Sequence, residues 1–83
     1  MNLPVTVTLN GNKYEVREGR IKDYGKCSTG TRTIIIRKKQ SDRDKAKTVF
    51  HEFLHLKLWF LDEGAILDLE DELWDAMEDC GII

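Results

Sequence analysis

The spacing of the apolar residues changes once along this chain, at Ser41. Before Ser41 they recur at every second residue, as in Val5–Leu9, and this is the period of a strand with one buried face. After Ser41 they recur at helical spacing in two segments. The sequence therefore predicts an α+β fold, with an N-terminal antiparallel β-sheet in residues 1–40 followed by two helices in residues 41–83.

The β-rich half is expected to begin with a hairpin. The turn sequence Asn10-Gly11-Asn12 separates two runs in which apolar and polar residues alternate. Residues 20–25 are then expected to form a short strand or extended segment. Residues 31–38 are expected to form a further strand, because Thr33–Ile36 is β-branched throughout.

The first helix is expected over residues 42–61. Ser41 and Asp44 approximate a capping box at its start. Apolar residues cover most of its circumference, so we expect it to lie between the sheet and the second helix. Asp68 can cap that second helix, expected over residues 69–80. Its inward-facing side chains are expected to be Leu69, Leu73, Ala76, Met77 and Cys80.

The size and composition of the chain fit one small globular domain over residues 1–83, with 41% hydrophobic and 34% charged residues. The longest strongly apolar stretch, Leu58–Leu61, is far short of the roughly 20 residues that span a bilayer. The N-terminus lacks the basic start of a signal peptide. Cys27 and Cys80 are too few for a small secreted disulfide scaffold, so free thiols are expected. We therefore expect a soluble, cytoplasmic protein without membrane contact, and a monomer.

The charge of the chain is distributed unevenly. Residues 1–47 hold twelve Lys and Arg against five Asp and Glu, whereas residues 48–83 hold one Lys against ten Asp and Glu. A basic half can bind an anionic partner such as nucleic acid, or it can attract the acidic half of the same domain. The basic residues are scattered through the expected strands without interleaved aromatic residues. We therefore favour attraction between the halves and do not expect nucleic acid as a partner.

The sequence His51-Glu52-Phe53-Leu54-His55 is an HExxH motif in the middle of the expected first helix. Residues i and i+4 of a helix project from one face, so two imidazoles at this spacing can bind one Zn²⁺ at about 2.0–2.1 Å each. Glu52 is turned away by about 100°, too far to ligate beside them, and is placed to take a proton from the metal-activated water. The sequence therefore predicts His51 and His55 as metal ligands, Glu52 as the catalytic residue and Zn²⁺ as the cofactor.

The third protein ligand that a catalytic zinc ion normally has cannot be a histidine, because both histidines are already used. Glu70 is favoured because it shares the inward side of the second helix with apolar residues, where a carboxylate needs a cationic partner. Glu72 is ranked next and Glu63 third. The remaining candidates are Asp62, Asp68, Asp71 and Cys80.

Thr48–His55, followed by Glu70 fifteen residues after the second histidine, resembles the gluzincin pattern. More narrowly, residues 21–80 are similar to small phage and prophage HExxH proteins related to the ImmA/IrrE-like metallopeptidases. Tyr24-Gly25 and Thr33–Ile36 match the glycine and the isoleucine-rich strand that those proteins place before the active helix. The resemblance implies a minimal zincin-like core in which the zinc ligands and the general base are His51, His55, Glu70 and Glu52.

The resemblance also implies a peptide or protein substrate, bound by strand addition along Thr33–Arg37. Tyr24 and Tyr14 are candidates for stabilising an oxyanion, although each is expected to pack its ring instead. The leading hypothesis is a zinc metallopeptidase that hydrolyses peptide bonds by metal-activated water. The alternatives are a non-catalytic binding module stabilised by zinc, and a small phage nucleic-acid-associated protein that uses residues 13–47.

Overall fold

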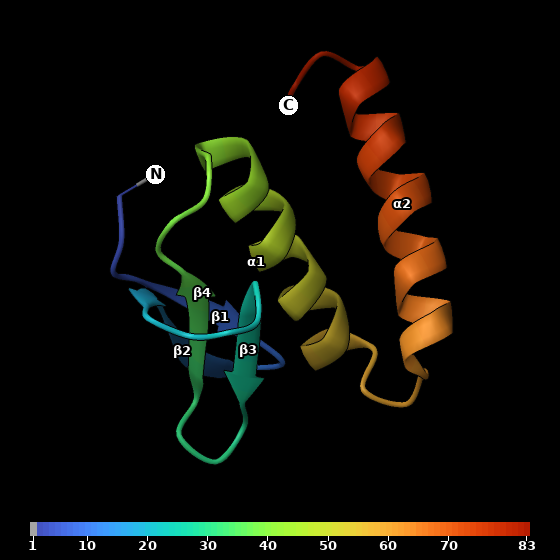
Figure 1. Cartoon of the computed structure of the whole chain (residues 1–83). Coiled ribbons are helices and arrows are strands. Elements are labelled where there is room, and N and C mark those ends of the chain that lie inside the picture. Colours follow the sequence, from blue (N-terminus) through green and yellow to red (C-terminus); the bar gives the residue numbers. More distant parts are fainter. Residues whose placement is uncertain (1) are drawn as a thin grey trace.

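The structure, a computed structural model that describes residues 2–83, has the expected α+β order of a sheet followed by two helices (Figure 1). The fold class predicted from the change of period at Ser41 is therefore confirmed. The elements are β1 (Val5–Leu9), β2 (Asn12–Gly19), β3 (Gly25–Ser28), β4 (Thr33–Arg37), α1 (Asp42–Lys57) and α2 (Glu63–Asp79).

The four strands form one sheet in the order β1-β2-β4-β3. The hairpin pairs β1–β2 and β3–β4 are antiparallel, whereas β2 and β4 are parallel, with Glu15 opposite Thr33 and Gly19 opposite Arg37. The sequence predicts an antiparallel sheet and does not indicate the parallel pair. Alternation shows which residues share a face of the sheet, but it does not show which strands are neighbours. The parallel pairing places β4 inside the sheet and leaves β1 and β3 as the edges.

The third strand lies at Gly25–Ser28 and not at residues 20–25, where an extended segment was expected. Two local features decide its position. A tight connection over residues 29–32, with Arg32 at φ 51°, turns β3 back onto β4. Gly25 meets α1 so closely that a Cβ there would lie 2.5 Å from the Thr48 methyl carbon Cγ2, so only glycine fits this crossing point.

The core lies between one face of the sheet and α1. Its buried residues are contributed by three elements: Tyr14 and Val16 from β2, Ile34 and Ile36 from β4, and Leu56 from α1. Helix α1 contacts β1, β3 and β4 on this side and α2 on its other side, whereas α2 contacts no element except α1 among the described residues (Figure 1). The predicted placement of α1 between the sheet and a second helix is therefore confirmed.

The helix boundaries differ from those expected. Helix α1 ends at Lys57, and α2 begins at Glu63, because the side chain of Asp62 caps it by accepting a hydrogen bond from the Ala65 amide at 2.8 Å. Gly64 lies in the first turn of α2 and does not separate the helices.

The buried side chains of α2 also differ from the expected inward-facing set. They are Ile66, Glu70 and Trp74, whereas Leu73 is 44% exposed and Cys80 is exposed. The buried stripe is therefore rotated by about one residue from the predicted one. Both cysteines are free, as expected. No helix within residues 2–83 has the length and apolar character that crossing a bilayer requires.

Candidate metal centre

The imidazoles of His51 and His55 lie side by side on one face of α1, one turn apart. Their ring centroids are 4.6 Å apart in an edge-on arrangement, and their Nε2 atoms approach to 3.1 Å. The helix is fixed at its start by the Ser41 cap and in its last turns by the buried Leu56. The spacing in the sequence therefore produces the convergence of two ring nitrogens that it predicts.

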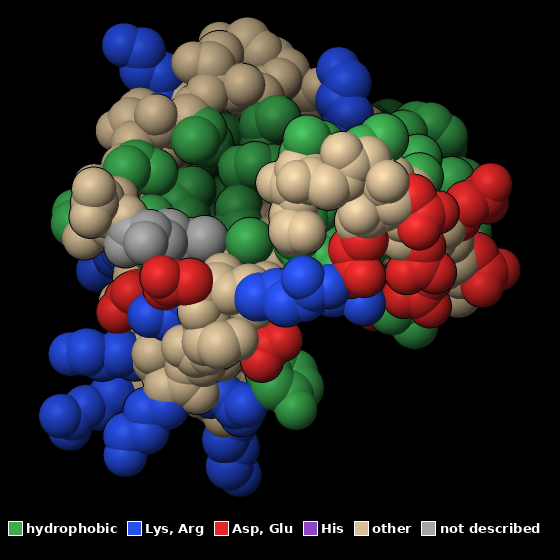
Figure 2. Space-filling view, turned by 90° about the horizontal axis from the view of Figure 1, so that it is seen from above, with side chains coloured by type: hydrophobic (Ala, Val, Ile, Leu, Met, Phe, Trp, Pro, Cys, Tyr) green, Lys and Arg blue, Asp and Glu red, His purple; other side chains and the backbone are tan. Residues whose placement is uncertain are grey.

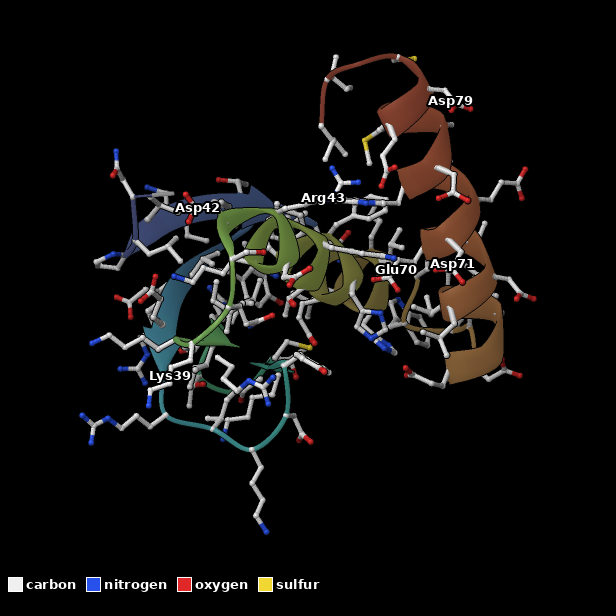
Figure 3. All side chains as sticks on the ribbon, turned by 45° about the horizontal axis from the view of Figure 1, so that its top comes forward. Lys39, Asp42, Arg43, Glu70, Asp71 and Asp79 are labelled. Carbon is white, nitrogen blue, oxygen red and sulfur yellow. The ribbon has the colours of Figure 1, made fainter. Side chains whose placement is uncertain are left out.

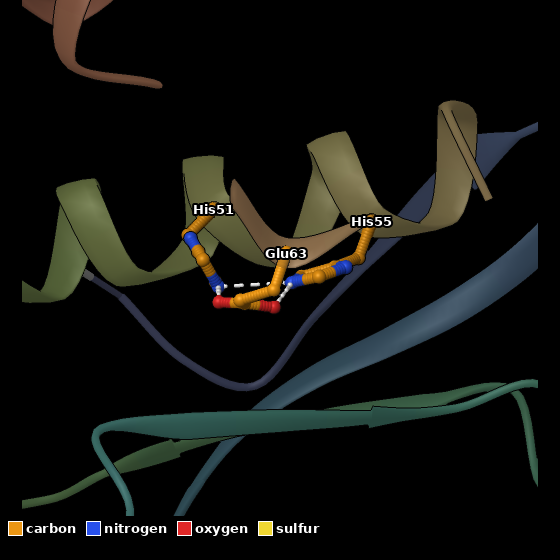
Figure 4. Close-up of side chains that lie close together, drawn as sticks. All are labelled: His51, His55 and Glu63. Carbon is orange, nitrogen blue, oxygen red and sulfur yellow. Dashed lines mark hydrogen bonds and ion pairs between the residues drawn. The ribbon is translucent and has the colours of Figure 1, made fainter. Parts of the chain in front are cut away.

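Glu63, the first residue of α2, supplies a carboxylate to the same point (Figure 4). Its Oε1 lies 3.4 Å from His51 Nε2, and its Oε2 lies 2.8 Å from His55 Nε2. One ligand atom from each of these three residues falls within 4.8 Å of the others. The Glu63 side chain is 60% exposed, so this group of donors is open to solvent on one side.

The distances within this group fit a tetrahedral ion. Zinc–nitrogen and zinc–oxygen bonds of about 2.0–2.1 Å at tetrahedral angles place neighbouring donor atoms about 3.3 Å apart. The distance of 3.1 Å between the two Nε2 atoms is close to this value, and each nitrogen lies near a different oxygen of Glu63, at 3.4 Å for Oε1 and 2.8 Å for Oε2. Two imidazole nitrogens and one carboxylate are also a donor set that suits Zn²⁺ and leaves a fourth position open.

Glu70, ranked first as the third ligand from the sequence, lies at the other nitrogen of His51. Its Oε2 is 3.3 Å from His51 Nδ1, and Figure 3 shows it between α1 and α2. An ionised carboxylate only accepts, so Nδ1–H donates to Glu70 and Nε2 keeps its lone pair. Glu70 is buried, at 7% exposure, and the group that meets its carboxylate is this imidazole, which is a neutral donor in that tautomer. Glu70 as a metal ligand stays a prediction, while the structure places Glu63 beside both Nε2 atoms.

Glu52, the predicted general base, is buried at 6% exposure on the side of α1 that faces β3. The Cys27 thiol of β3 donates a hydrogen bond to its carboxylate. Burial, then this hydrogen bond and the negative charge of Glu52, raise the pKa of the Cys27 thiol to about 12. The thiol is therefore a neutral donor to Glu52 at physiological pH. Nothing in the HExxH spacing indicates this contact, because it depends on which strand lies under the helix.

A cleft of about 540 Å³ adjoins both His51 and Glu52. It runs between α1, α2 and the segment before β3, and its lining includes Tyr24, Gly25 and Thr48. Tyr24 is 65% exposed at this cleft, with the Arg37 guanidinium 4.2 Å from its ring centre, so its expected packing role is wrong. Tyr14 is buried in the core as expected.

The strand predicted to accept a substrate, Thr33–Arg37, is unsuitable. This strand is β4, and both of its edges are already paired, with β2 and with β3. Strand addition requires a free edge, which in this sheet belongs to β1 and β3. The prediction is therefore corrected, and β3 is the edge strand that adjoins the cleft through Gly25.

The remaining acidic candidates have other positions. Glu72 is exposed, Asp62 caps α2, and Asp71 forms an ion pair with Lys47 at 3.7 Å. Glu63 ranks third among the candidates from the sequence, and it lies six residues before the expected start of the second helix at residue 69. The signal that favours Glu63 is the Asp62 cap, which makes it the first residue of a helix that starts beside the end of α1.

The resemblance of residues 21–80 to small HExxH metallopeptidases stays a prediction. No family model, no curated protein and no solved structure matches this chain.

Proposed function

We propose that this chain is a minimal zinc-dependent peptidase, with His51, His55 and Glu63 as metal ligands and Glu52 as the general base. The observation that carries the proposal is the convergence of two Nε2 atoms and a carboxylate at distances of 2.8–3.4 Å. Zn²⁺ bound there would supply Lewis-acid activation of a water molecule and of a carbonyl oxygen. The proposal assigns the remaining work to side chains of the chain itself.

Glu52 is assigned the proton transfers. Its carboxylate lines the cleft next to His51 and can accept a proton at one oxygen from an attacking water, then deliver it to the leaving amine. The Cys27 thiol holds this carboxylate from the β3 side. Glu70 holds the His51 ring in the tautomer whose Nε2 faces Glu63. We assign to Tyr24 the stabilisation of the developing oxyanion, because this exposed residue lines the same cleft.

We propose a peptide substrate, or an extended segment of a protein, that adds to the free edge of β3. The cleft has the size of a small-molecule or peptide side-chain site and continues past Gly25 toward Glu52. An extended chain at this edge would lie beside the cleft that Gly25, His51 and Glu52 line. This placement replaces the strand-addition site at Thr33–Arg37.

A second candidate function is a metal-stabilised binding module without turnover. The observation that favours it is the attachment of α2, which contacts only α1 among the elements of the described chain. An ion bound by His51, His55 and Glu63 would join α1 to α2, so binding energy would become folding energy. This role requires the three ligands but does not require Glu52 as a base.

The substitution Glu52→Gln separates these functions. The amide keeps the shape of the carboxylate, so zinc content and fold should be unchanged, while hydrolysis of a peptide library should fall by about 10²–10⁴-fold. Glu72→Gln, an exposed acid of α2, is the matched control and should retain full activity. His51→Ala should lose the metal. Zinc-loaded wild-type protein that cleaves no peptide, or a Glu52→Gln variant that cleaves like the wild type, would contradict the peptidase and leave the binding module.

A further inference from the structure

The face of the sheet opposite α1 is open. Helix α1 covers one face, α2 lies beyond α1, and no described helix contacts the other face. Along each strand, successive side chains point to opposite faces of the sheet. The buried Tyr14, Val16, Ile34 and Ile36 face α1, as do the residues paired with them on neighbouring strands. The residues between them face outward. The outward positions therefore form a continuous surface across all four strands.

This open face is basic. Lys13 and Arg17 of β2, Lys26 of β3 and Arg37 of β4 occupy outward positions, and Lys26 and Arg17 both flank Ile35 in the pairing register. Glu15 is the single acidic outward residue in the described strands, and it forms an ion pair with Arg17 at 3.6 Å. The other outward side chains are small and hydroxyl-bearing on three strands: Thr6, Thr8, Ser28 and Thr33.

Further basic residues extend this face at one end of the sheet. Because β2 and β4 are parallel, the segments that follow them leave the sheet at the same end, and the Lys38 amide donates to the Gly19 carbonyl at 3.2 Å. Arg37 Nη1 donates to the Lys22 carbonyl at 3.1 Å and ties the two segments together. Exposed basic residues in these segments are Arg20, Lys22, Lys38 and Lys39.

Apart from Glu15 on this face and the exposed Asp23 beside Lys22, most acidic residues lie elsewhere. In Figure 2 most Lys and Arg side chains project from the lower left of the molecule, whereas Asp and Glu gather at the right, over α2. In Figure 3, Lys39 lies on the opposite side of the molecule from Asp71 and Asp79. Basic residues that looked scattered along the sequence are therefore gathered by strand alternation and by the parallel pairing.

We propose that this open face and its basic end bind the phosphate backbone of double-stranded nucleic acid, independently of the metal centre. Arg, Lys, Ser and Thr are the side chains that contact phosphate oxygens in such interfaces, and these are the residues present. The outward residues of the four described strands include no aromatic side chain, and the exposed Tyr24 beside them has the Arg37 guanidinium 4.2 Å from its ring centre, so a duplex fits better than a single strand of stacked bases. Binding is expected to be independent of base sequence.

A protein partner fits this face less well. The centres of protein interfaces are enriched in aromatic residues and depleted of lysine, whereas here Ile35 is the one large apolar outward residue of the four strands. Asp71 and Glu78 of α2 form ion pairs with Lys47 and Arg43 of their own α1, while Asp68, Asp75 and Asp79 are exposed, so binding of α2 from a second copy is the competing outcome that the sedimentation experiment below tests. Double-stranded nucleic acid, a polyanion with regularly spaced charges, is therefore the better match for this face.

The test is fluorescence anisotropy of a labelled duplex DNA of about 20 base pairs, titrated with the full chain between 50 and 200 mM NaCl. The affinity should fall with salt, with a slope of about −0.9 in log–log form for each phosphate contacted. The double variant Arg17→Ala/Lys26→Ala should reduce the magnitude of this slope by about 2 and weaken binding by roughly 10-fold or more near 100 mM NaCl. Lys38→Ala/Lys39→Ala, in a loop away from the core, should act in the same direction.

The matched control is Arg43→Ala/Lys57→Ala. It also removes two positive charges, but from α1, which lies on the other face of the sheet, so it should change the affinity less than 2-fold. Absence of binding at 50 mM NaCl, or equal losses in the control and in Arg17→Ala/Lys26→Ala, would overturn the proposal. Equal displacement of the duplex by polyglutamate would assign the face to an acidic polypeptide. A salt-sensitive dimer in sedimentation without DNA, lost in Arg17→Ala/Lys26→Ala, would assign it to a second copy.

Discussion

At the scale of single residues, His51 has two ring nitrogens and each faces a different carboxylate. Nδ1–H donates to Glu70, and Nε2 faces Glu63 and the Nε2 of His55. A ring that donates through Nδ1 presents its lone pair at Nε2, so the two carboxylates have different roles. Glu70 would orient a donor nitrogen, whereas Glu63 would share a bound ion with it.

Matched glutamine substitutions should therefore rank the three glutamates of α2. Glu63→Gln should weaken Zn²⁺ binding the most because it removes a charged donor, and Glu70→Gln should weaken it by about 10- to 100-fold because it loosens the His51 ring. Glu72→Gln should have no effect because Glu72 is exposed. Competition titration with a chromogenic chelator measures all three. A larger loss for Glu70→Gln than for Glu63→Gln would make Glu70 the third ligand, as the sequence ranked it.

The two cysteines should differ strongly in reactivity. Burial and the neighbouring Glu52 raise the pKa of Cys27 to about 12, so at pH 8 a much smaller fraction of it is thiolate than at the ordinary value of 9.0. Cys27 should therefore react with a disulfide reagent roughly 100-fold or more slowly than the exposed Cys80. The variants Cys27→Ser and Cys80→Ser isolate each thiol. Equal rates in the two variants would show that Cys27 is neither shielded from solvent nor paired with Glu52.

At the scale of elements, α2 contacts α1 and no other helix or strand of residues 2–83. Its buried residues are Ile66, Glu70 and Trp74, and the Trp74 ring lies 6.0 Å from that of Phe50. Trp59, by contrast, is 78% exposed. An interface of this size is thin for a helix of 17 residues, so an ion shared between α1 and α2 would contribute a large part of what holds α2 in place.

Metal removal should therefore loosen α2. Zn²⁺ at 100 times its dissociation constant stabilises the folded state by about 2.7 kcal/mol, which corresponds to roughly 10–20 °C in Tm for a domain of this size. A chelator should reverse this shift and move the Trp74 emission to the red, since Trp74 would lose its contact with Phe50. The variant Trp59→Phe leaves Trp74 as the only reporter, and His55→Ala serves as the control without zinc dependence. An unchanged Tm and emission on chelation would contradict a structural role of the ion.

The elements also show what the sequence could predict. The β1–β2 hairpin and α1 carry strong periods and clear turn or cap residues, and both were predicted. The position of β3 depends on how closely Gly25 approaches Thr48, which is a tertiary contact. The site shows the same difference. The spacing of His51 and His55 on one helix predicts that they lie together, whereas the position of Glu63 depends on where α2 begins. Contacts between elements, and not propensity, decide which carboxylate the structure places beside both Nε2 atoms.

At the scale of the whole molecule, the opposite charges of the two halves are partly neutralised by ion pairs between them. Lys47 pairs with Asp71, and Arg43 pairs with Glu78, so the acidic α2 is drawn to the basic start of α1. Attraction between the halves, which the sequence analysis favoured, therefore operates across the helix interface. These ion pairs do not involve the outward face of the sheet, which stays basic. The acidic α2 does not reach that face because α1 lies between α2 and the sheet.

The donors of the proposed centre all lie within residues 51–63, on two helices joined by a short loop. Contacts so close in sequence form faster than a pairing such as β2–β4, which joins strands separated by the whole of β3. Capture of an ion would therefore belong to the early steps of folding, before the sheet is complete. The supply of zinc during refolding would then set how soon the last helix takes its place.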